Sequence, residues 1–200
     1  MIAQLALQPG HRVLHFGGDE AALRAAVGAE GIVTATTLDS ELPHHANSFD
    51  AAWVQEQLIG LADPAGAVGE LAWVVRAGGR IALCEADWAS LAIASEDRAT
   101  TAIITAEIAA GRGDIGRHLP RLLAAAGCHR ISIGAETLVL DLATLDEVAG
   151  LAIAREHCVR AKKITAEAAE AWWDGLQELD RDGGFYGALT FVRAVGVVMG

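Results

Sequence analysis

The chain has 200 residues and a formal net charge of −11 at pH 7, and 52% of its residues are hydrophobic. This length suits one domain with a single core, and the negative charge disfavours nucleic acids and membrane surfaces, which attract clustered Lys and Arg. No apolar run reaches the roughly 18 residues that span a bilayer, and the start of the chain resembles no signal peptide.

The mean hydropathy of +0.32 is high for a soluble monomer, so we expect a homodimer or a subunit of a complex. The three cysteines, Cys84, Cys128 and Cys158, lack the spacing of metal ligands and lie in apolar stretches. They predict small buried side chains in a reducing cytoplasm.

Residues 12–16 predict the first β-strand, after which Gly17 and Gly18 begin a turn into a helix over 22–27. The next strand is predicted over 31–39 and ends on Asp39. His15 lies on the first strand, where either a hydrogen-bonded core histidine or a functional one fits. Asp39 likewise fits either a turn residue or a carboxylate that accepts two hydroxyl donors.

Two adjacent histidines, His44 and His45, follow in a loop. Neighbouring side chains do not face one metal ion, and no third ligand has a suitable spacing. We therefore predict a solvated pair and no metal site, with a general base at the edge of the sheet as the alternative.

Residues 48–88 predict a strand, a helix and a second, parallel strand. Asp63 is expected to cap the helix, Pro64 to take its first position, and Gly78-Gly79 to end it. A parallel sheet in an α/β protein binds its ligand beyond the carboxyl ends of the strands. The polar side chains at these ends are therefore candidates for chemistry: Gln55, Glu56, Glu85 and Asp87.

Beyond residue 88 the patterns predict further helices, one more strand and a final strand that pairs in antiparallel fashion at the sheet edge. The helices are expected over 95–111, 117–126, 145–163 and 165–180, and the strands over 130–142 and 185–198. Several aromatic side chains are candidates to line an apolar substrate cavity, with core packing as the alternative for each. These are Trp88, Trp172, Trp173, Phe185 and Tyr186.

Several stretches resemble class I S-adenosylmethionine-dependent methyltransferases, most closely the small-molecule branch related to the ubiquinone-type enzymes. The middle of the family is matched by Phe49-Asp50-Ala51-Ala52-Trp53 and by Val74-Val75-Arg76-Ala77-Gly78-Gly79-Arg80. Residues 116–127 resemble the penultimate helix of the family, and residues 185–190 resemble its last strand.

The resemblance implies an α/β fold with a Rossmann-like sheet that is mostly parallel and has an antiparallel C-terminal edge strand. It implies a single domain over 1–200, with a cofactor-binding half over 1–88 and substrate-side helices and final strands over 89–200. Residues 1–10 are too few for the helical cap that the family usually carries before its first strand. About one helix–strand unit is missing between the second and fourth strands of the family pattern.

The family holds S-adenosylmethionine at the turn after its first strand, which carries an acidic residue and three alternating glycines. On this pattern His15 takes the acidic position, Gly17 the first glycine, Asp19 the second and Ala21 the third. The charge of Asp19 would repel the carboxylate of the cofactor, so we expect weak or no use of S-adenosylmethionine. The cofactor contacts that the resemblance implies are Gly17, Gly18, Asp19, Asp39 and Gln55.

Three functions stay open. The first is a repurposed biosynthetic enzyme, a cyclase, isomerase or lyase for a hydrophobic small molecule, with acid/base groups among His15, Glu56, Glu85 and Asp87. The second is an active small-molecule methyltransferase, because methyl transfer depends mainly on proximity and alignment. The third is a non-catalytic, methyltransferase-like subunit of a complex. We favour the first.

Overall fold

The computed structural model describes residues 2–39 and 41–200, and Met1 and Ser40 lie outside the described residues. The chain divides into two compact units. The first comprises Met1–Ala86, Ile115–Ala135 and Val192–Gly200, and the second comprises Asp87–Asp114 and Glu136–Phe191. The predicted division of one domain after residue 88 stays a prediction. The first unit also takes in two later segments that the sequence analysis placed with the substrate side.

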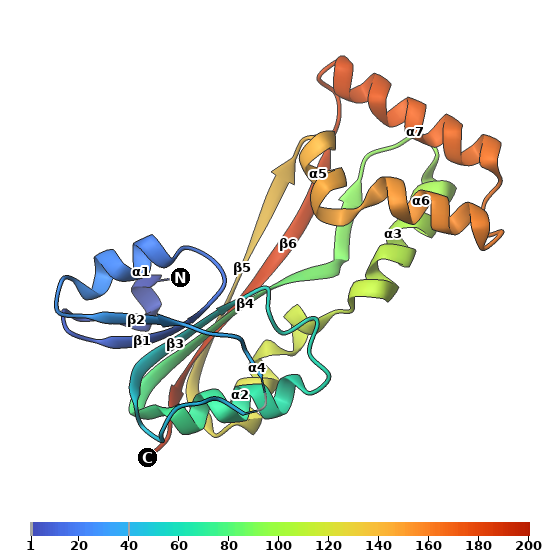
Figure 1. Cartoon of the computed structure of the whole chain (residues 1–200). Helices are drawn as coiled ribbons and strands as arrows, with labels where there is room; N and C mark the ends of the chain where they lie inside the picture. Colours follow the sequence, from blue (N-terminus) through green and yellow to red (C-terminus); the bar gives the residue numbers. More distant parts are fainter. Residues whose placement is uncertain (1, 40) are drawn as a thin grey trace. The chain divides into compact units, whose positions relative to one another are not determined.

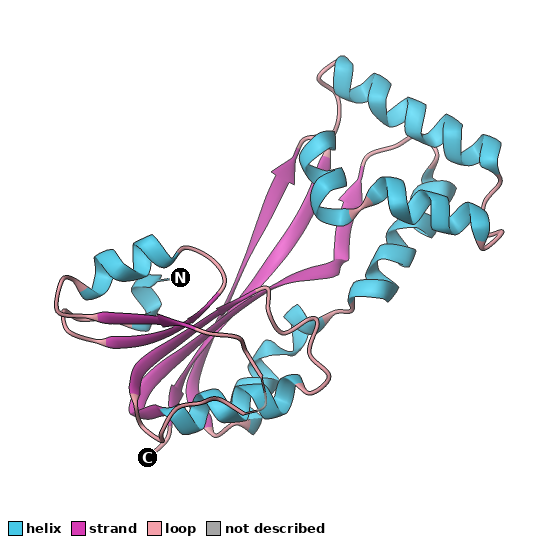
Figure 2. Cartoon of the chain, viewed as in Figure 1, coloured by secondary structure: helices cyan, strands magenta, loops and turns pink. Residues whose placement is uncertain are grey.

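The elements follow one another along the chain as Figures 1 and 2 show. Up to residue 93 they are η1 (Ile2–Leu5), β1 (Arg12–Phe16), α1 (Glu20–Val27), β2 (Ile32–Ala35), β3 (Phe49–Gln55), α2 (Pro64–Val74) and β4 (Val75–Ile93). The later elements are α3 (Arg98–Arg112), α4 (Ile115–Ala125), β5 (Cys128–Leu140), α5 (Leu142–Ala149), α6 (Leu151–Arg160), α7 (Ala166–Arg181) and β6 (Gly187–Val198).

The strands form one sheet in the order β2-β1-β3-β4-β6-β5. β1 pairs in parallel with both β2 and β3, and β3 pairs in parallel with β4. β6 runs against β4 and β5 (Figure 2). The sequence predicts a mostly parallel sheet with an antiparallel C-terminal edge strand. The parallel part and the antiparallel direction of the final strand are confirmed, but its place at the edge is not. β6 lies between β4 and β5, and the outermost strand is β5.

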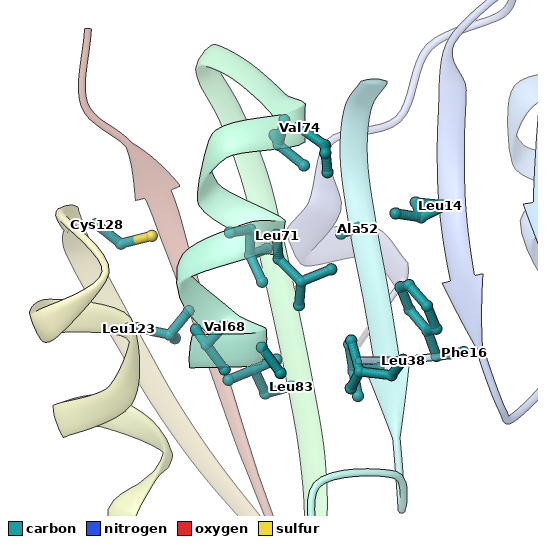
Figure 3. Close-up of a cluster of buried hydrophobic side chains, with 14 of the residues drawn as sticks. Leu14, Phe16, Leu38, Ala52, Val68, Leu71, Val74, Leu83, Leu123 and Cys128 are labelled. Carbon is teal, nitrogen blue, oxygen red and sulfur yellow. The ribbon is translucent and has the colours of Figure 1, made fainter. Parts of the chain in front are cut away.

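Apolar side chains pack on both faces of the strands in the first unit. On one face, α2 and α4 cover a cluster that includes Leu14, Val68, Leu71 and Leu123, all fully buried (Figure 3). On the other face, α1 packs on a second cluster around Val13, Leu23, Ala51 and Trp53. Burial on both faces explains the nearly continuous apolar runs of β1 and β3, which are typical of parallel strands.

The helix α2 begins as its sequence predicts. The Asp63 side chain accepts a hydrogen bond of 2.9 Å from the backbone N–H of Gly66, and Pro64 occupies the first turn. The predicted end is wrong, because α2 ends at Val74 and the two glycines lie within β4. The pairing of β3 with β4 is irregular there, and a Cβ atom at Gly79 would lie 2.6 Å from the backbone oxygen of Asp50. Gly78-Gly79 therefore allows the irregular pairing of β4 with β3 and does not end the helix.

Two further predicted elements differ from the structure. The strand expected over 31–39 is only Ile32–Ala35, and the residues after it form a loop whose Leu38 is buried in the core. The helix expected over 145–163 is two helices, α5 and α6, which meet at Gly150. Gly150 has a φ of +68° and ends α5 in the left-handed conformation, which favours glycine.

The second unit contains α3, α5, α6 and α7 together with parts of β4, β5 and β6. Its α7 is capped by Thr165, as predicted, through a hydrogen bond of 3.2 Å from the backbone N–H of Ala168. Glu107 of α3 forms ion pairs with Lys163 and, at 2.6 Å, with Nδ1 of His157. These contacts join α3 to the end of α6 and the turn that follows it.

Candidate functional site

The turn between β1 and α1 keeps two glycines in a conformation that other residues rarely adopt. Gly17 has a φ of +71° and Gly18 a φ of +80°. A Cβ atom at Gly17 would lie 2.5 Å from the backbone oxygen of Gln55. A Cβ atom at Gly18 would lie 2.5 Å from Oε1 of Gln55 and 3.0 Å from Nε1 of Trp53. Both glycines are therefore required by the backbone conformation and by the close approach of β3.

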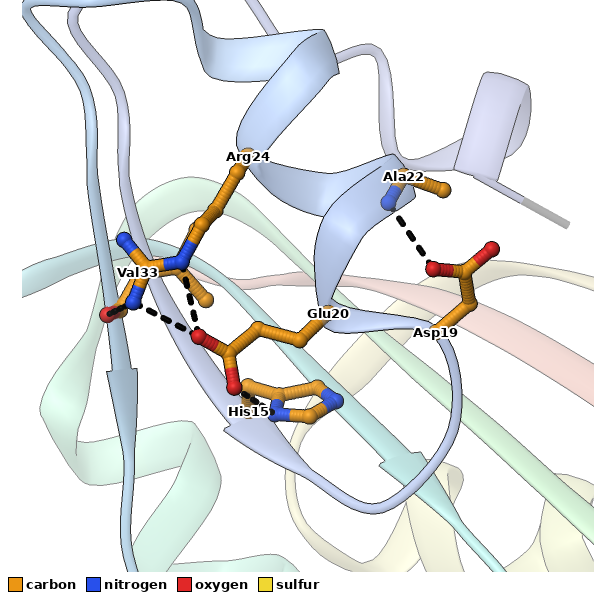
Figure 4. Close-up of polar contacts among 6 residues, drawn as sticks. All are labelled: His15, Asp19, Glu20, Ala22, Arg24 and Val33. Atoms are coloured by element: carbon orange, nitrogen blue, oxygen red, sulfur yellow. Dashed lines mark hydrogen bonds and ion pairs between the residues drawn. The ribbon is translucent and has the colours of Figure 1, made fainter.

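Asp19 ends this turn and caps α1. Its Oδ1 accepts a hydrogen bond of 2.9 Å from the backbone N–H of Ala22, one of the donors that a helix start leaves without a partner inside the helix (Figure 4). The negative charge of Asp19 thus lies at the positive end of the α1 dipole. The position that the family gives to its second glycine carries a helix cap in this chain.

His15 lies near the carboxyl end of β1 and is only 6% exposed. Its Nδ1 lies 4.0 Å from Oε2 of Glu20, and neither ring nitrogen makes a hydrogen bond. Oε1 of Glu20 is held by Nη2 of Arg24 at 2.6 Å and by its Nε at 2.7 Å (Figure 4). The carboxylate of Glu20 thus lies between the guanidinium of Arg24 and one edge of the imidazole, and the opposite edge of the ring points away from it (Figure 4).

Trp53 is the neighbour of His15 on β3. The two residues are paired in the parallel register of β1 and β3, and directly paired residues of adjacent strands share a face of the sheet. Trp53 is 5% exposed, and its Nε1–H also lacks a hydrogen-bond partner. Two neighbouring buried side chains therefore present polar nitrogens without partners. Such groups are rare in folded proteins and require an explanation.

Sequence reasoning missed Trp53 and Glu20 as parts of this site. Trp53 follows Ala51-Ala52 in the sequence, but only its pairing with His15 in the register of β1 and β3 places it at the site. Glu20 directly follows a candidate cofactor residue, but only the capped start of α1 brings it back toward β1.

At the end of β3 the chain is held by a buried carboxylate of β4. Oε1 of Glu85 accepts hydrogen bonds from the backbone N–H groups of Gln57, at 2.9 Å, and of Leu58, at 2.7 Å. Burial raises the pKa of Glu85 to about 7, with a smaller upward contribution from Glu56, although the two backbone donors lower it. Glu56 itself has a φ of +53°, a strained value for a non-glycine residue. The structure thus brings Glu85 to the turn that follows Gln55 and Glu56, and Gln55 itself lies beside Gly17 and Gly18.

Asp39 is placed differently from its prediction. It is exposed in the loop after β2, four residues beyond the end of that strand at Ala35. It therefore does not end a strand, although its predicted contact with ribose hydroxyls stays a prediction. Of the loop histidines, His45 is exposed, while the ring of His44 packs edge-on against Phe49 with centroids 4.9 Å apart.

The remaining predicted residues lie in the second unit. Asp87 is buried, and so is Trp88, whose ring lies 4.2 Å from the guanidinium carbon of Arg112. Trp172 is 2% exposed and donates a hydrogen bond of 2.8 Å from its Nε1 to Oγ1 of Thr101.

The other aromatic candidates of this unit are more accessible. Phe185 is half-buried, and Tyr186 is 45% exposed. A pocket of about 470 Å³ is lined by Trp173 together with residues of α5 and α7, among them Asp146 and Gln177. Trp173 is therefore the aromatic candidate that lines this pocket.

Metal ligands do not gather in the described part of the chain, where no three His, Cys, Asp or Glu side chains could hold an ion together. Within residues 2–39 and 41–200, no helix is both long and apolar enough to cross a membrane.

Comparison with known proteins shows which proteins this chain resembles in sequence and in fold. Residues 2–83 match the family described as methyltransferase domain. An uncharacterised 37.1 kDa protein in transposon Tn4556 of Streptomyces fradiae is 37% identical over 159 residues, which cover 77% of this chain and 45% of that relative. The chain thus spans about half the length of this relative.

Solved structures agree with this match at the level of the fold. The YcgJ protein of Bacillus subtilis is 15% identical, with a TM-score of 0.59 over 100% of this chain and 97% of its own. A proposed methyltransferase of Bacillus halodurans C-125 is 12% identical, with the same TM-score and coverage. The predicted resemblance is therefore confirmed at the level of the fold: residues 2–83 match the methyltransferase domain model, and the whole chain has the fold of these solved structures.

Proposed function

We propose that this protein is an enzyme that acts on a hydrophobic small molecule in a biosynthetic pathway and uses S-adenosylmethionine weakly or not at all. The observation that carries the proposal is the crowding of the turn after β1. A Cβ atom at Gly18 would lie 2.5 Å from Oε1 of Gln55 and 3.0 Å from Nε1 of Trp53, so these two side chains lie close to the turn that a nucleoside cofactor would approach.

The residues that the family uses for S-adenosylmethionine fit this cofactor poorly. Its amino-acid end would meet the carboxylate of Asp19, which repels the carboxylate of the cofactor. The first free donors of α1 are partly used, because Ala22 already donates to Asp19. Asp39, the candidate for the ribose, lies in a loop and not at the end of β2. We therefore derive no chemical step through this cofactor.

The same region supports acid/base chemistry. Glu85 is a buried carboxyl group whose pKa is raised to about 7 by burial, and groups of this kind cluster at catalytic sites. His15 is a second buried titratable side chain near the carboxyl edge of the same sheet. Cyclisation, isomerisation and elimination all require proton transfers that such groups can perform at neutral pH.

An active methyltransferase is the second candidate. It is favoured by the two glycines that keep positive φ values at the cofactor turn. Methyl transfer would require only alignment of the substrate with the cofactor, so the residues of this turn do not argue against the chemistry itself. These residues argue against tight binding of S-adenosylmethionine.

Isothermal titration with S-adenosylmethionine and with S-adenosylhomocysteine separates the two candidates. We expect no saturable heat of binding with either ligand up to a concentration of about 100 μM. A dissociation constant of that size corresponds to a binding free energy of about −5.5 kcal/mol. A dissociation constant in the low micromolar range, about −8 kcal/mol, would overturn the proposal and restore the methyltransferase. Cooperative thermal unfolding of the same sample controls for its folded state.

We also propose that the protein acts as a homodimer or as a subunit of a complex. Ile133 and Val139 on the outermost strand β5 are each 63% exposed, and exposed apolar edge strands are sites of association. Light scattering of the purified chain tests the homodimer, and the mass of a monomer would contradict it.

A further inference from the structure

We infer that His15 and Trp53 form an acid/base site for a neutral carbonyl compound, in which His15 moves a proton at the carbon next to the carbonyl group and Trp53 hydrogen-bonds the carbonyl oxygen. This inference rests on the proposed function and names the substrate class of that function. Glu20 is assigned as the residue that positions His15.

The first support is the pairing of two buried side chains that lack partners. His15 and Trp53 are paired side by side in the register of β1 and β3, and they are 6% and 5% exposed. Both nitrogens of His15 and Nε1 of Trp53 make no hydrogen bond within the protein. An indole N–H is only a donor, so the group that satisfies it must be an acceptor, such as a carbonyl oxygen.

The second support is the row of charged side chains, Arg24 and then Glu20, that leads to one edge of the His15 imidazole. Arg24 holds the carboxylate of Glu20, and Glu20 lies 4.0 Å from Nδ1 of His15 (Figure 4). A carboxylate on one ring nitrogen fixes the tautomer that leaves the other nitrogen, Nε2, able to accept a proton. A separation of 4.0 Å is longer than a hydrogen bond, but catalytic contacts often tighten only when the substrate binds.

The third support concerns the charge of the ligand. Asp19 places an exposed carboxylate at the turn beside His15, and this charge repels an anionic ligand, whereas the carboxylate of Glu20 is paired with Arg24. Val13 and Ala51, on the same face of the sheet, are fully or almost fully buried and provide apolar surroundings. A neutral, hydrophobic ketone meets both conditions and also supplies the acceptor that Trp53 lacks.

The step that follows is an enolisation. Nε2 of His15 takes a proton from the carbon next to the carbonyl group. The electron pair of the broken C–H bond becomes a C=C bond, and the C=O π pair moves to the oxygen. The enolate oxygen accepts the hydrogen bond of Trp53 Nε1. Return of the proton to the same carbon exchanges that hydrogen with solvent, and return to the far carbon of a dienolate moves the double bond and completes an isomerisation without any oxidant or reductant.

Deuterium exchange tests this step directly. The protein is incubated in D₂O with 2-tetralone, a hydrophobic ketone with activated hydrogens beside its carbonyl group, and the loss of their proton signal is followed by NMR. We expect exchange above that of an equal concentration of free imidazole. His15→Ala should lower the rate on the order of 100-fold or more, and added imidazole should restore part of it, which a purely structural role would not allow.

Two further variants separate the assigned roles. Trp53→Phe keeps an aromatic ring at this position but removes the N–H, and we expect a loss on the order of 100-fold in turnover. Glu20→Gln should lower kcat with KM unchanged, because it acts on His15 and not on the ketone. Trp73→Phe, at an exposed site of α2, and Glu30→Gln, at an exposed site after α1, are the matched controls and should leave the rate unchanged.

A binding measurement keeps the inference testable if His15→Ala does not fold. The chain has five tryptophans, and the indole ¹⁵N–¹H signal of Trp53 is the one absent from the Trp53→Phe spectrum. We expect this signal to shift when 2-tetralone is added to the wild-type protein. If no shift occurs and the exchange rate equals that of free imidazole, the inference is wrong. Its failure is distinct from that of the proposed function, which the titration with S-adenosylmethionine decides independently.

Discussion

Oε1 of Glu85 accepts a hydrogen bond of 2.7 Å from the backbone N–H of Leu58, across the gap between β4 and the turn that follows β3. The same oxygen also accepts the N–H of Gln57. One side chain therefore replaces the ladder hydrogen bonds that end with β3 and holds the strained turn at Glu56 against the sheet. The candidate acid/base group is in this way also a structural one.

Glu85→Gln should make stability less dependent on pH. Glutamine keeps the accepting oxygen but has no charge to bury. Because burial raises the folded-state pKa of Glu85 from 4.5 to about 7, wild-type Glu85 favours folding below pH 4.5, and this contribution is lost as the pH rises through 7. We expect Glu85→Gln to match the wild type near pH 4 and to be about 2–3 kcal/mol more stable at pH 8.

Urea unfolding at pH 4 and pH 8 measures this difference in the free energy of unfolding. Glu30→Gln, which changes an exposed carboxylate, is the control and should show no comparable change. A Glu85→Gln protein that is less stable than the wild type at both pH values would mean that the carboxylate is ionised and favourable when buried.

The two glycines of the β1–α1 turn should respond unequally to alanine. Both have positive φ values, which cost about 1–2 kcal/mol for an alanine. The added Cβ at Gly17 meets the backbone oxygen of Gln55, which cannot rotate away, whereas at Gly18 it meets the end of the Gln55 side chain. We expect Gly18→Ala to lose about 1–2 kcal/mol of unfolding free energy and Gly17→Ala to lose clearly more.

The double variant Gly18→Ala/Gln55→Ala tests the reason for this difference. It removes the clash at Oε1 but keeps the backbone strain, so its loss should be smaller than the sum of the two single losses. Urea unfolding at pH 7 provides the comparison. Equal losses of unfolding free energy for Gly17→Ala and Gly18→Ala would indicate that the positive φ values alone cause the loss and that the contact with β3 does not contribute.

The hydrogen bond from Trp172 to Thr101 should matter for stability. Thr101→Val keeps the shape of the side chain but leaves the buried indole N–H without an acceptor, which costs about 1–3 kcal/mol. Thr105→Val, one turn further along α3, is the control, because Oγ1 of Thr105 bonds only to carbonyl oxygens of its own helix. Thermal unfolding of both variants measures the effect, and equal losses would contradict it.

Local signals in the sequence were sufficient for several elements. The Asp63-Pro64 and Thr165 starts act through neighbouring backbone groups, so they were predictable and α2 and α7 begin as expected. Gly78-Gly79 gave the same kind of signal, but its use depends on how β3 meets β4. Its meaning could not be read from spacing alone.

The candidate site was predictable only in part for the same reason. The rule that parallel strands bind ligands at their carboxyl ends selected Gln55, Glu56, Glu85 and Asp87, and the structure places Glu85 against the turn that follows Gln55 and Glu56. The register of β1 against β3 decides that Trp53 lies beside His15. The cap at Asp19 decides that Glu20 faces the imidazole. Both contacts depend on how separate segments of the chain meet in the fold. A single sequence carries no direct signal for such contacts.

Asp19 allows the charge of the turn to be separated from its shape. Asp19→Asn keeps an oxygen that can accept the N–H of Ala22, and Asn and Asp are nearly equal as helix caps. We expect the stability of α1 to fall only by the lost charge–dipole interaction, about 0.3–1 kcal/mol. If the carboxylate repels S-adenosylmethionine, this variant should bind it more tightly than the wild type, and titration calorimetry measures the gain.

Asp19→Gly extends the comparison, because it removes both the charge and the cap and frees the N–H of Ala22 for a ligand. It should bind S-adenosylmethionine at least as well as Asp19→Asn, while Asp19→Ala should lose about 1 kcal/mol of stability through the missing cap. If neither Asn nor Gly improves binding, the charge at this turn is not the obstacle. The cause would then lie in the side chains of Gln55 and Trp53 close to Gly18 or in the short β2 with its displaced Asp39, where no change at residue 19 can act.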